Sequence, residues 1–456
     1  MTHARRFVRR APLLLLLTLA VWVAPATAQP TKAPPAKPQP AAAQPAKSQP
    51  ATAQPAKAAV EGCATCHRDT GDERLAGPVK LFDGDIHKAK GFGCVACHGG
   101  DGKSAEMDAM DPAKGYVGKP GRGQLTQLCG RCHSDARFMK QYNPALRVDQ
   151  VAEYATSVHG RRLRELNDPK VATCANCHPA HSIKPPSDPA SSVHPLRVAQ
   201  TCGQCHADAK YMAGYKIPTD QLAKYTQSVH WKTMSAKGDL SAPTCNDCHG
   251  NHGAAPPGVS WVGNVCGQCH TVMADLFGKS VHARAFRDLG VPGCAACHEN
   301  HDIKPASTEM LGLGGPAVCS TCHDAESKGG RAALEMRALI DGLRKERDRA
   351  SEILGRAEHA GMEVSQARFE LSGATDELIK ARAAIHAFQV AAVKKQADAG
   401  LTIAQKAYAR GVRALEELRF RRTGLVVSLV IIVVLIAALV LKIRQIERRT
   451  RSPIQG

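Results

Sequence analysis

The sequence predicts a mainly α-helical protein with much irregular structure, in which a cysteine-rich region precedes long helices and one C-terminal transmembrane helix. Three observations support this fold class. The motif C-x-x-C-H occurs nine times within residues 61–325. Aromatic residues make up only 4% of the 456 residues, fewer than an ordinary core of this size contains. Residues 329–422 are rich in Ala, Leu, Glu, Lys and Arg and contain no Pro, which is typical of long helices.

The nine motifs use all 18 cysteines and leave none for a disulfide. Zinc sites do not need a histidine after every second cysteine, and a redox dithiol does not need nine copies, so the motif indicates covalent haem c. The cysteines expected to bind nine haems are Cys63, Cys66, Cys94, Cys97, Cys129, Cys132, Cys174, Cys177, Cys202, Cys205, Cys245, Cys248, Cys266, Cys269, Cys294, Cys297, Cys319 and Cys322. The motif histidines expected to bind iron are His67, His98, His133, His178, His206, His249, His270, His298 and His323.

The haem region, residues 61–325, is too short to enclose each haem in its own pocket. We expect the haems to pack against one another and form the core, with short motif helices joined by loops rich in Gly and Pro. Without haem this region should not fold, for the reason that small metal domains do not.

A repeated unit follows the first motif. It consists of an upstream histidine, a decorated motif that continues as C-x-x-C-H-x-x-H, and a plain motif. The upstream histidines belong to Ser-Val-His triplets, at His159, His230 and His282. The trailing histidines of the decorated motifs are His181, His252 and His301. His87 and the motifs at Cys94 and Cys129 form a first copy, which lacks the trailing histidine.

Each iron needs a second axial ligand, and histidines that recur at fixed offsets from haem motifs are expected to supply it. We expect His252 to bind a neighbouring haem, since three residues cannot easily loop from His249 round the macrocycle. The candidates within the haem region are His87, His159, His181, His194, His230, His252, His282 and His301. Eight candidates leave one of nine irons open, for which we favour His386 over His359, Met107, Met110 or a vacant position.

The remaining segments are assigned by composition. Residues 326–422 are expected to form a hairpin or bundle of two or three long helices, with breaks near residues 372–376 and 400–402, where Gly and N-cap residues cluster. A continuous coiled-coil stalk is the alternative. Residues 423–441 should span a membrane, because residues 425–441 carry no charge. A buried soluble helix is the alternative for that segment.

The N-terminal and C-terminal segments of the chain predict the cellular compartment of the haem region. Residues 1–28 have the basic start, apolar run and Ala-Thr-Ala end of a secretory signal peptide, with a short membrane anchor as the alternative. Residues 29–60 form a Pro- and Ala-rich linker. The basic residues 442–456 are expected to be cytoplasmic, which places a single-pass protein in the inner membrane with its haem region in the periplasm.

The nine motifs, the Ser-Val-His triplets and the C-x-x-C-H-x-x-H endings resemble those of the cytochrome c3-like family of multihaem cytochromes c with doubled C-x-x-C-H motifs. The resemblance covers residues 61–325 and implies mostly bis-histidine, low-potential irons in a wire of closely spaced haems. The later long helices are similar to those of cytochrome c nitrite reductases and hydroxylamine oxidoreductases, but the chain has no C-x-x-C-K motif. Its C-terminal anchor also differs from the N-terminal anchor of quinol-oxidising cytochromes.

These features predict an electron carrier more than an enzyme. The expected partners are a quinol-oxidising membrane subunit, periplasmic or outer-membrane cytochromes, and the membrane itself. A reductase of nitrite, hydroxylamine or a sulfur oxyanion at one five-coordinate haem is the alternative. Another is a quinol-oxidising subunit, which would need a partner to form a quinone pocket. Nucleic acid is not expected as a partner, because haem propionates offset much of the formal charge of +19.

Overall fold

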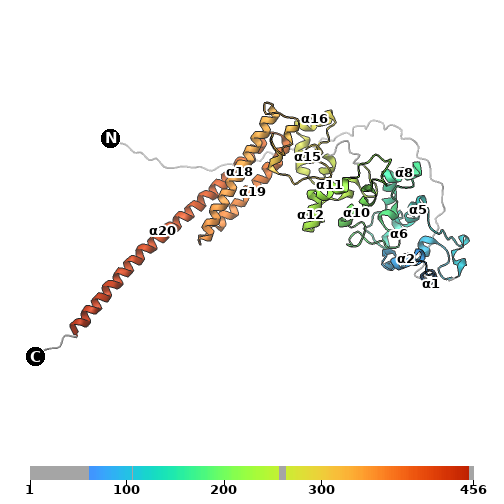
Figure 1. Cartoon of the computed structure of the whole chain (residues 1–456), viewed down its shortest axis with the longest axis horizontal. Helices are drawn as coiled ribbons and strands as arrows, with labels where there is room; N and C mark the ends of the chain where they lie inside the picture. The colour runs from blue at the N-terminus through green and yellow to red at the C-terminus, as the bar shows by residue number, and fades with distance from the viewer. Residues whose placement is uncertain (1–60, 105, 256–262, 451–456) are drawn as a thin grey trace, which may run out of the picture. The chain divides into compact units, whose positions relative to one another are not determined.

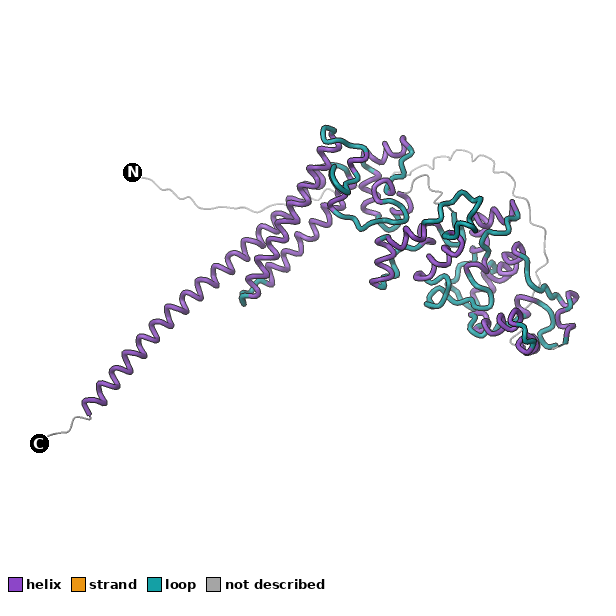
Figure 2. Tube along the Cα trace, viewed as in Figure 1, coloured by secondary structure: helices purple, strands orange, loops and turns teal. Residues whose placement is uncertain are grey.

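The computed structural model describes residues 61–104, 106–255 and 263–450 (Figure 1). The predicted signal peptide and Pro/Ala-rich linker lie outside these residues. Within the described ranges every regular element is a helix, and loops separate the short helices of the haem region (Figure 2). The mainly α fold with much irregular structure is therefore confirmed.

The short helices carry the motifs and the histidines around them. Up to the third motif they are α1 Glu61–Asp69, α2 Glu73–Phe82, α3 Ile86–Ala89, α4 Val95–His98, η1 Met107–Met110, η2 Pro112–Lys114, α5 Arg122–His133 and α6 Ala136–Lys140. The next are α7 Gln150–Thr156, α8 Val158–Leu166, α9 Cys174–Cys177, α10 Pro195–His206, α11 Gln221–Gln227, α12 Val229–Lys237 and α13 Cys245–His249. The last are α14 Gly263–Cys266, α15 Thr271–Gly278, α16 Val281–Leu289, α17 Ala295–His298, η3 Thr308–Met310 and η4 Cys319–Thr321.

Each upstream histidine lies at the second position of a helix that begins with a buried cap. The caps are Asp85, Ser157, Ser228 and Ser280, which are between 0% and 8% exposed. Each serine hydroxyl accepts a hydrogen bond from the backbone N–H three residues later, and the Asp85 carboxylate accepts one from His87 N. Such caps fix where a helix starts, so they also fix where the histidine lies.

A backbone hydrogen bond joins each of the first three units to the next one. The first helical residue after the cap donates its N–H to the carbonyl two residues beyond the next unit's trailing histidine. The bonds are Ile86 N to Ile183 O at 2.8 Å, Val158 N to Ala254 O at 3.1 Å, and Val229 N to Ile303 O at 2.8 Å. The first N–H groups of a helix have no partner within it, so each unit satisfies a donor of the one before.

The long helices α18 Lys328–His359, α19 Ser365–Ala384 and α20 Val390–Thr450 pack side by side (Figure 1). Their core is mainly aliphatic and small, and includes Ile340, Leu343, Leu354 and Leu378. Leu311, between the last two haem motifs, joins this core. The bundle is thereby packed directly against the haem region.

Both helix breaks expected within this region are wrong. Residues 372–376 lie inside α19 and residues 400–402 inside α20, and the actual breaks are at residues 360–364 and 385–389. The glycines are packing positions: a Cβ at Gly400 would lie 2.8 Å from the Leu343 methyls, and one at Gly373 would lie 3.4 Å from Ile403 Cδ1. Helices approach closely where a residue has no side chain, so glycine here favours contact between helices.

The second half of α20 is the one helix among the described residues that is long and apolar enough to cross a membrane. Its apolar side chains are exposed, whereas Val393, Ala397 and Ala404 in the first half are completely buried. One continuous helix therefore links the bundle to the predicted span.

We predict that Gly400→Ala destabilises the bundle by about 1–2 kcal/mol, because overpacking outweighs the gain in helix propensity. The matched control is Gly355→Ala in α18, where a Cβ would meet nothing within 4 Å. The control should raise the unfolding temperature, since it gains propensity without a clash. Thermal unfolding followed by far-UV circular dichroism measures both, and equal shifts would contradict the packing role.

We predict that Ser228→Ala speeds amide exchange in α12, because loss of an N-cap costs about 1 kcal/mol. Ser228→Asp should preserve slow exchange, since Asp85 caps the equivalent helix of the first unit. Hydrogen-exchange mass spectrometry of peptides covering α12 measures the effect. Equal protection in the alanine variant and the unmodified protein would contradict it.

Candidate haem-binding sites

The motif helices present their cysteines in pairs. In α9 and α13 the two cysteines are three residues apart, so they lie on one face of a single helical turn. A threonine precedes each of these helices, Thr173 and Thr244, and each is 3% exposed. The backbone N–H of the threonine donates a hydrogen bond to the side chain three residues later, Asn176 or Asp247. All 18 cysteines are free of disulfides, as thioether attachment requires.

Eight motif histidines each face the ring of a second histidine, with ring centroids 5.9–6.3 Å apart. The pairs are His87 and His133, His98 and His181, His159 and His206, His178 and His252, His230 and His270, His249 and His301, His282 and His323, and His298 and His386.

This separation fits one iron between two imidazoles. A metal–nitrogen distance of about 2.0–2.1 Å on each side, plus about 1.1 Å from each nitrogen to its ring centroid, gives about 6.3 Å. The observed distances reach this value and fall at most a few tenths of an ångström below it. The donor set therefore fits haem iron with two axial histidines.

The pairing follows the repeated unit. Each upstream histidine faces the plain motif of its own unit, as His159 faces His206. Each trailing histidine faces the first motif of the preceding unit, as His252 faces His178. This holds also for the first copy, whose motif at Cys94 has no trailing histidine of its own but is faced by His181. No later unit supplies a trailing histidine for His298, and His386 of the bundle faces it instead.

The second ring nitrogen has a hydrogen-bond partner in four of the pairs. Nδ1 lies 2.8 Å from Gly118 O in His98, 3.2 Å from Ala255 O in His249 and 3.0 Å from Ala383 O in His386. In His87 it lies 2.9 Å from the Asp85 carboxylate. An Nδ1–H that donates to an oxygen leaves Nε2 unprotonated and free to bind metal.

Burial favours the neutral imidazoles that metal binding requires. Desolvation is the largest cause of the lowered pKa of eleven paired histidines: His133, His159, His178, His181, His206, His230, His252, His282, His298, His301 and His386.

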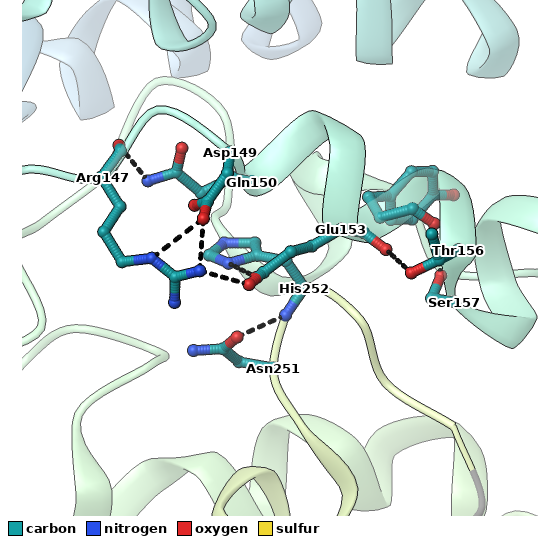
Figure 3. Close-up of polar contacts among 9 residues, drawn as sticks. Arg147, Asp149, Gln150, Glu153, Thr156, Ser157, Asn251 and His252 are labelled. Atoms are coloured by element: carbon teal, nitrogen blue, oxygen red, sulfur yellow. Dashed lines mark hydrogen bonds and ion pairs between the residues drawn. The ribbon is translucent and has the colours of Figure 1, made fainter. Parts of the chain in front are cut away.

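The preceding unit also holds the side chain of His252. His252 Nδ1 lies 3.7 Å from the Glu153 carboxylate of α7, which is ion-paired to Arg147 (Figure 3). The Asn251 side chain accepts a 2.7 Å hydrogen bond from His252 N. No sequence signal pointed to Glu153, because it lies about a hundred residues away from this histidine.

The turn between α19 and α20 reaches the last two haem sites. His386 faces His298, and the Phe388 ring centroid lies 3.9 Å from that of His282. Phe388 has a φ of 51°, which is uncommon for a bulky residue. Sequence analysis missed Phe388, although this aromatic lies two residues after the favoured ligand His386.

Three histidines of the described residues face no other histidine ring. His67 is the motif histidine of α1. His359 is exposed at the end of α18, with Nδ1 2.7 Å from Gly355 O. His194 is 6% exposed and caps α10, where its Nδ1 accepts a hydrogen bond from Leu196 N. An Nδ1 that accepts leaves the proton on Nε2, so the geometry does not favour His194 as a ligand.

His194 also belongs to a Ser-Val-His triplet, yet its local structure differs from that of the other three. Pro195 has no N–H and occupies the first helical position, so the helix starts one residue after the histidine. The Ser192 hydroxyl consequently bonds Cys177 O instead of capping the helix.

The motifs follow one another in space in chain order. In three pairs the neighbouring thiol is the largest cause of a shifted pKa, which is raised in one partner and lowered in the other: Cys129 with Cys174, Cys202 with Cys245, and Cys266 with Cys294. At the other five steps burial and then the adjacent thiol raise the pKa of a cysteine: Cys94 beside Cys63, Cys97 beside Cys132, Cys177 beside Cys205, Cys248 beside Cys266, and Cys297 beside Cys319.

Two family models match the chain. Residues 86–207, which contain four motifs, match the model described as cytochrome c3. Residues 289–328, which contain the last two, match the doubled CXXCH motif. Searches of curated proteins and of solved structures gave no match. Together with the cysteine pairs and facing histidines, these matches identify the chain as a multihaem c-type cytochrome, related to cytochrome c3, that binds haem c covalently.

Proposed function

We propose that this cytochrome binds nine haems, that eight of the irons have two histidine ligands, and that the haems relay electrons between a membrane and acceptors in the periplasm or at the outer membrane. The eight facing histidine pairs carry the proposal. An iron with both axial positions taken by histidine transfers electrons and offers no position to a substrate. Bound haem supplies the iron that alternates between its ferric and ferrous states.

The chain's own residues hold the haems in place and set their order. We assign the second ligands to His87, His159, His181, His230, His252, His282, His301 and His386. The thiol contacts support a relay that runs from the motif at Cys63 to the motif at Cys319. The last two motifs adjoin the bundle through Leu311, and α20 continues from that bundle into the apolar segment.

We further propose that electrons enter at the membrane end of this relay. The span has no ionisable residue between positions 425 and 441, so it offers little to bind a quinone, and a quinol-oxidising partner subunit would supply the electrons. The basic residues after the span support a cytoplasmic tail and a periplasmic haem region.

A reductase acting at one five-coordinate haem is the second candidate function. The observation that favours it is that His67 is the one motif histidine without a facing ring among the described residues. The spin state of the ninth iron separates the two candidates, because a carrier with nine six-coordinate irons has no site for a substrate.

We predict that His252→Ala converts one low-spin iron to high spin, and that this iron is the one bound by His178. Continuous-wave EPR spectra of His252→Ala, His178→Ala and the double variant should lose the same low-spin signal. The double variant should lose no more than either single variant, because both histidines act on one iron. His359→Ala, which changes an exposed histidine, is the matched control and should alter nothing.

The outcome that would contradict this pairing is specific. If His252→Ala removed the same low-spin signal as His249→Ala, then His252 would bind the iron of its own motif. Counting low-spin irons separates the two outcomes, since the imidazole planes are nearly parallel in both pairs, at 12° for His178 and His252 and 8° for His249 and His301. The double variant His249→Ala/His252→Ala should lose two low-spin irons, whereas it would lose one if both histidines served the same iron.

We predict that a chain ending at Arg422 leaves the membrane fraction while keeping its haem spectrum. The removed segment contains the apolar residues that span a bilayer, whereas the buried contacts of α20 precede it. Fractionation of cells with haem staining measures the distribution. Retention of the shortened chain in the membrane would show that another part of the protein anchors it.

A further inference from the structure

We infer that the haem bound by Cys63, Cys66 and His67 is the one with an open iron, and that this position binds a diatomic molecule that prefers ferrous iron. The inference rests on the proposed function, because it requires the eight facing pairs to be ligand pairs. It deepens that function by locating the ninth iron and naming the ligand class.

The histidines of the chain leave no ring for this iron. The eight pairs use 16 of the 20 histidines. His3 lies in the predicted signal peptide, and the others are His67 itself, His194 and His359. His194 is covered by protein and caps α10, while His359 is exposed on the bundle and bonded to Gly355 O.

The repeat explains why this iron lacks a facing histidine. A trailing histidine faces the first motif of the preceding unit, two motifs back along the chain, as His181, His252 and His301 do. The second motif of a unit is instead faced by the upstream histidine of the same unit, as His206 is by His159. The motif at Cys63 directly precedes the first copy and so takes the place of a second motif, and residues 29–60 supply no upstream histidine for it.

The loop at residues 101–104 lies against the first motif. A Cβ built at Gly62 in α1 would be 2.6 Å from Ser104 O and 3.2 Å from Gly102 O. The Asp101 carboxylate of this loop accepts a 3.0 Å hydrogen bond from Lys103 N and lies 3.8 Å from Lys114 Nζ. Carboxylate oxygen is a poor substitute for imidazole on haem iron, so Asp101 does not replace the missing histidine.

Few other side chains could bind this iron. Residues 29–60 contain no histidine and no methionine. Met107 is 76% exposed, which is unlike the buried environment of the paired histidines. Met110 is half-buried in η1, and the experiment tests it directly.

The experiment measures carbon monoxide binding by the dithionite-reduced full-length cytochrome, together with the spin states of the oxidised protein. The unmodified protein should bind about one CO per chain and show about one high-spin iron. Cys63→Ala/Cys66→Ala should abolish both the CO binding and the high-spin signal, because it removes the covalent attachment of this haem. Asp101→Asn and Met110→Leu should both still bind one CO.

The outcomes distinguish this inference from the proposed function. Nine low-spin irons without CO binding would overturn the inference and leave the relay intact, whereas several high-spin irons would overturn the pairing itself. CO binding that is retained in the Cys63→Ala/Cys66→Ala variant would overturn the assignment of the open iron to the first motif.

Discussion

The arrangement of two imidazoles on opposite sides of one iron is the constraint on which the rest of this structure depends. The rings must stay about 6 Å apart, with unprotonated nitrogens turned toward the metal. With few aromatic residues and a short haem region, side chains alone cannot maintain such gaps. We therefore propose that the haems act as the core and that the facing histidines join segments distant in sequence, so that folding depends on haem attachment.

The repeated unit satisfies this constraint in two ways. A buried Ser or Asp cap fixes the upstream histidine against the plain motif of its own unit, as Ser228 does for His230. The trailing histidine faces back toward the preceding unit, as His301 faces His249, and the hydrogen bond from Val229 N to Ile303 O joins the same two units. Histidine and backbone contacts thus link each unit to its neighbour. Only the first and last motifs of the array lack such a neighbour on one side.

The two ends are closed differently. At the bundle, the turn before α20 places His386 opposite His298 and packs Phe388 against His282. The helix that follows this turn continues into the apolar segment, so one helix connects the last two motifs to the candidate span. At the first motif, by contrast, His67 faces no other histidine among the described residues. Closed coordination suits electron entry from a protein partner, whereas an open position suits a small molecule.

The sequence by itself determined the covalent chemistry, the mainly α class, the repeat and the apolar span, because each depends on spacing within a short stretch of chain. It also identified His386 as a ligand candidate. Only the tertiary structure decided that Gly400 is a packing position within a helix, since the space at this residue is limited by Leu343 of another helix. The same holds for the partner of each histidine. His194 shares the Ser-Val-His triplet yet becomes a helix cap, because the helix starts at Pro195, two residues later than in the other triplets. The partner of His252 is set by packing between units.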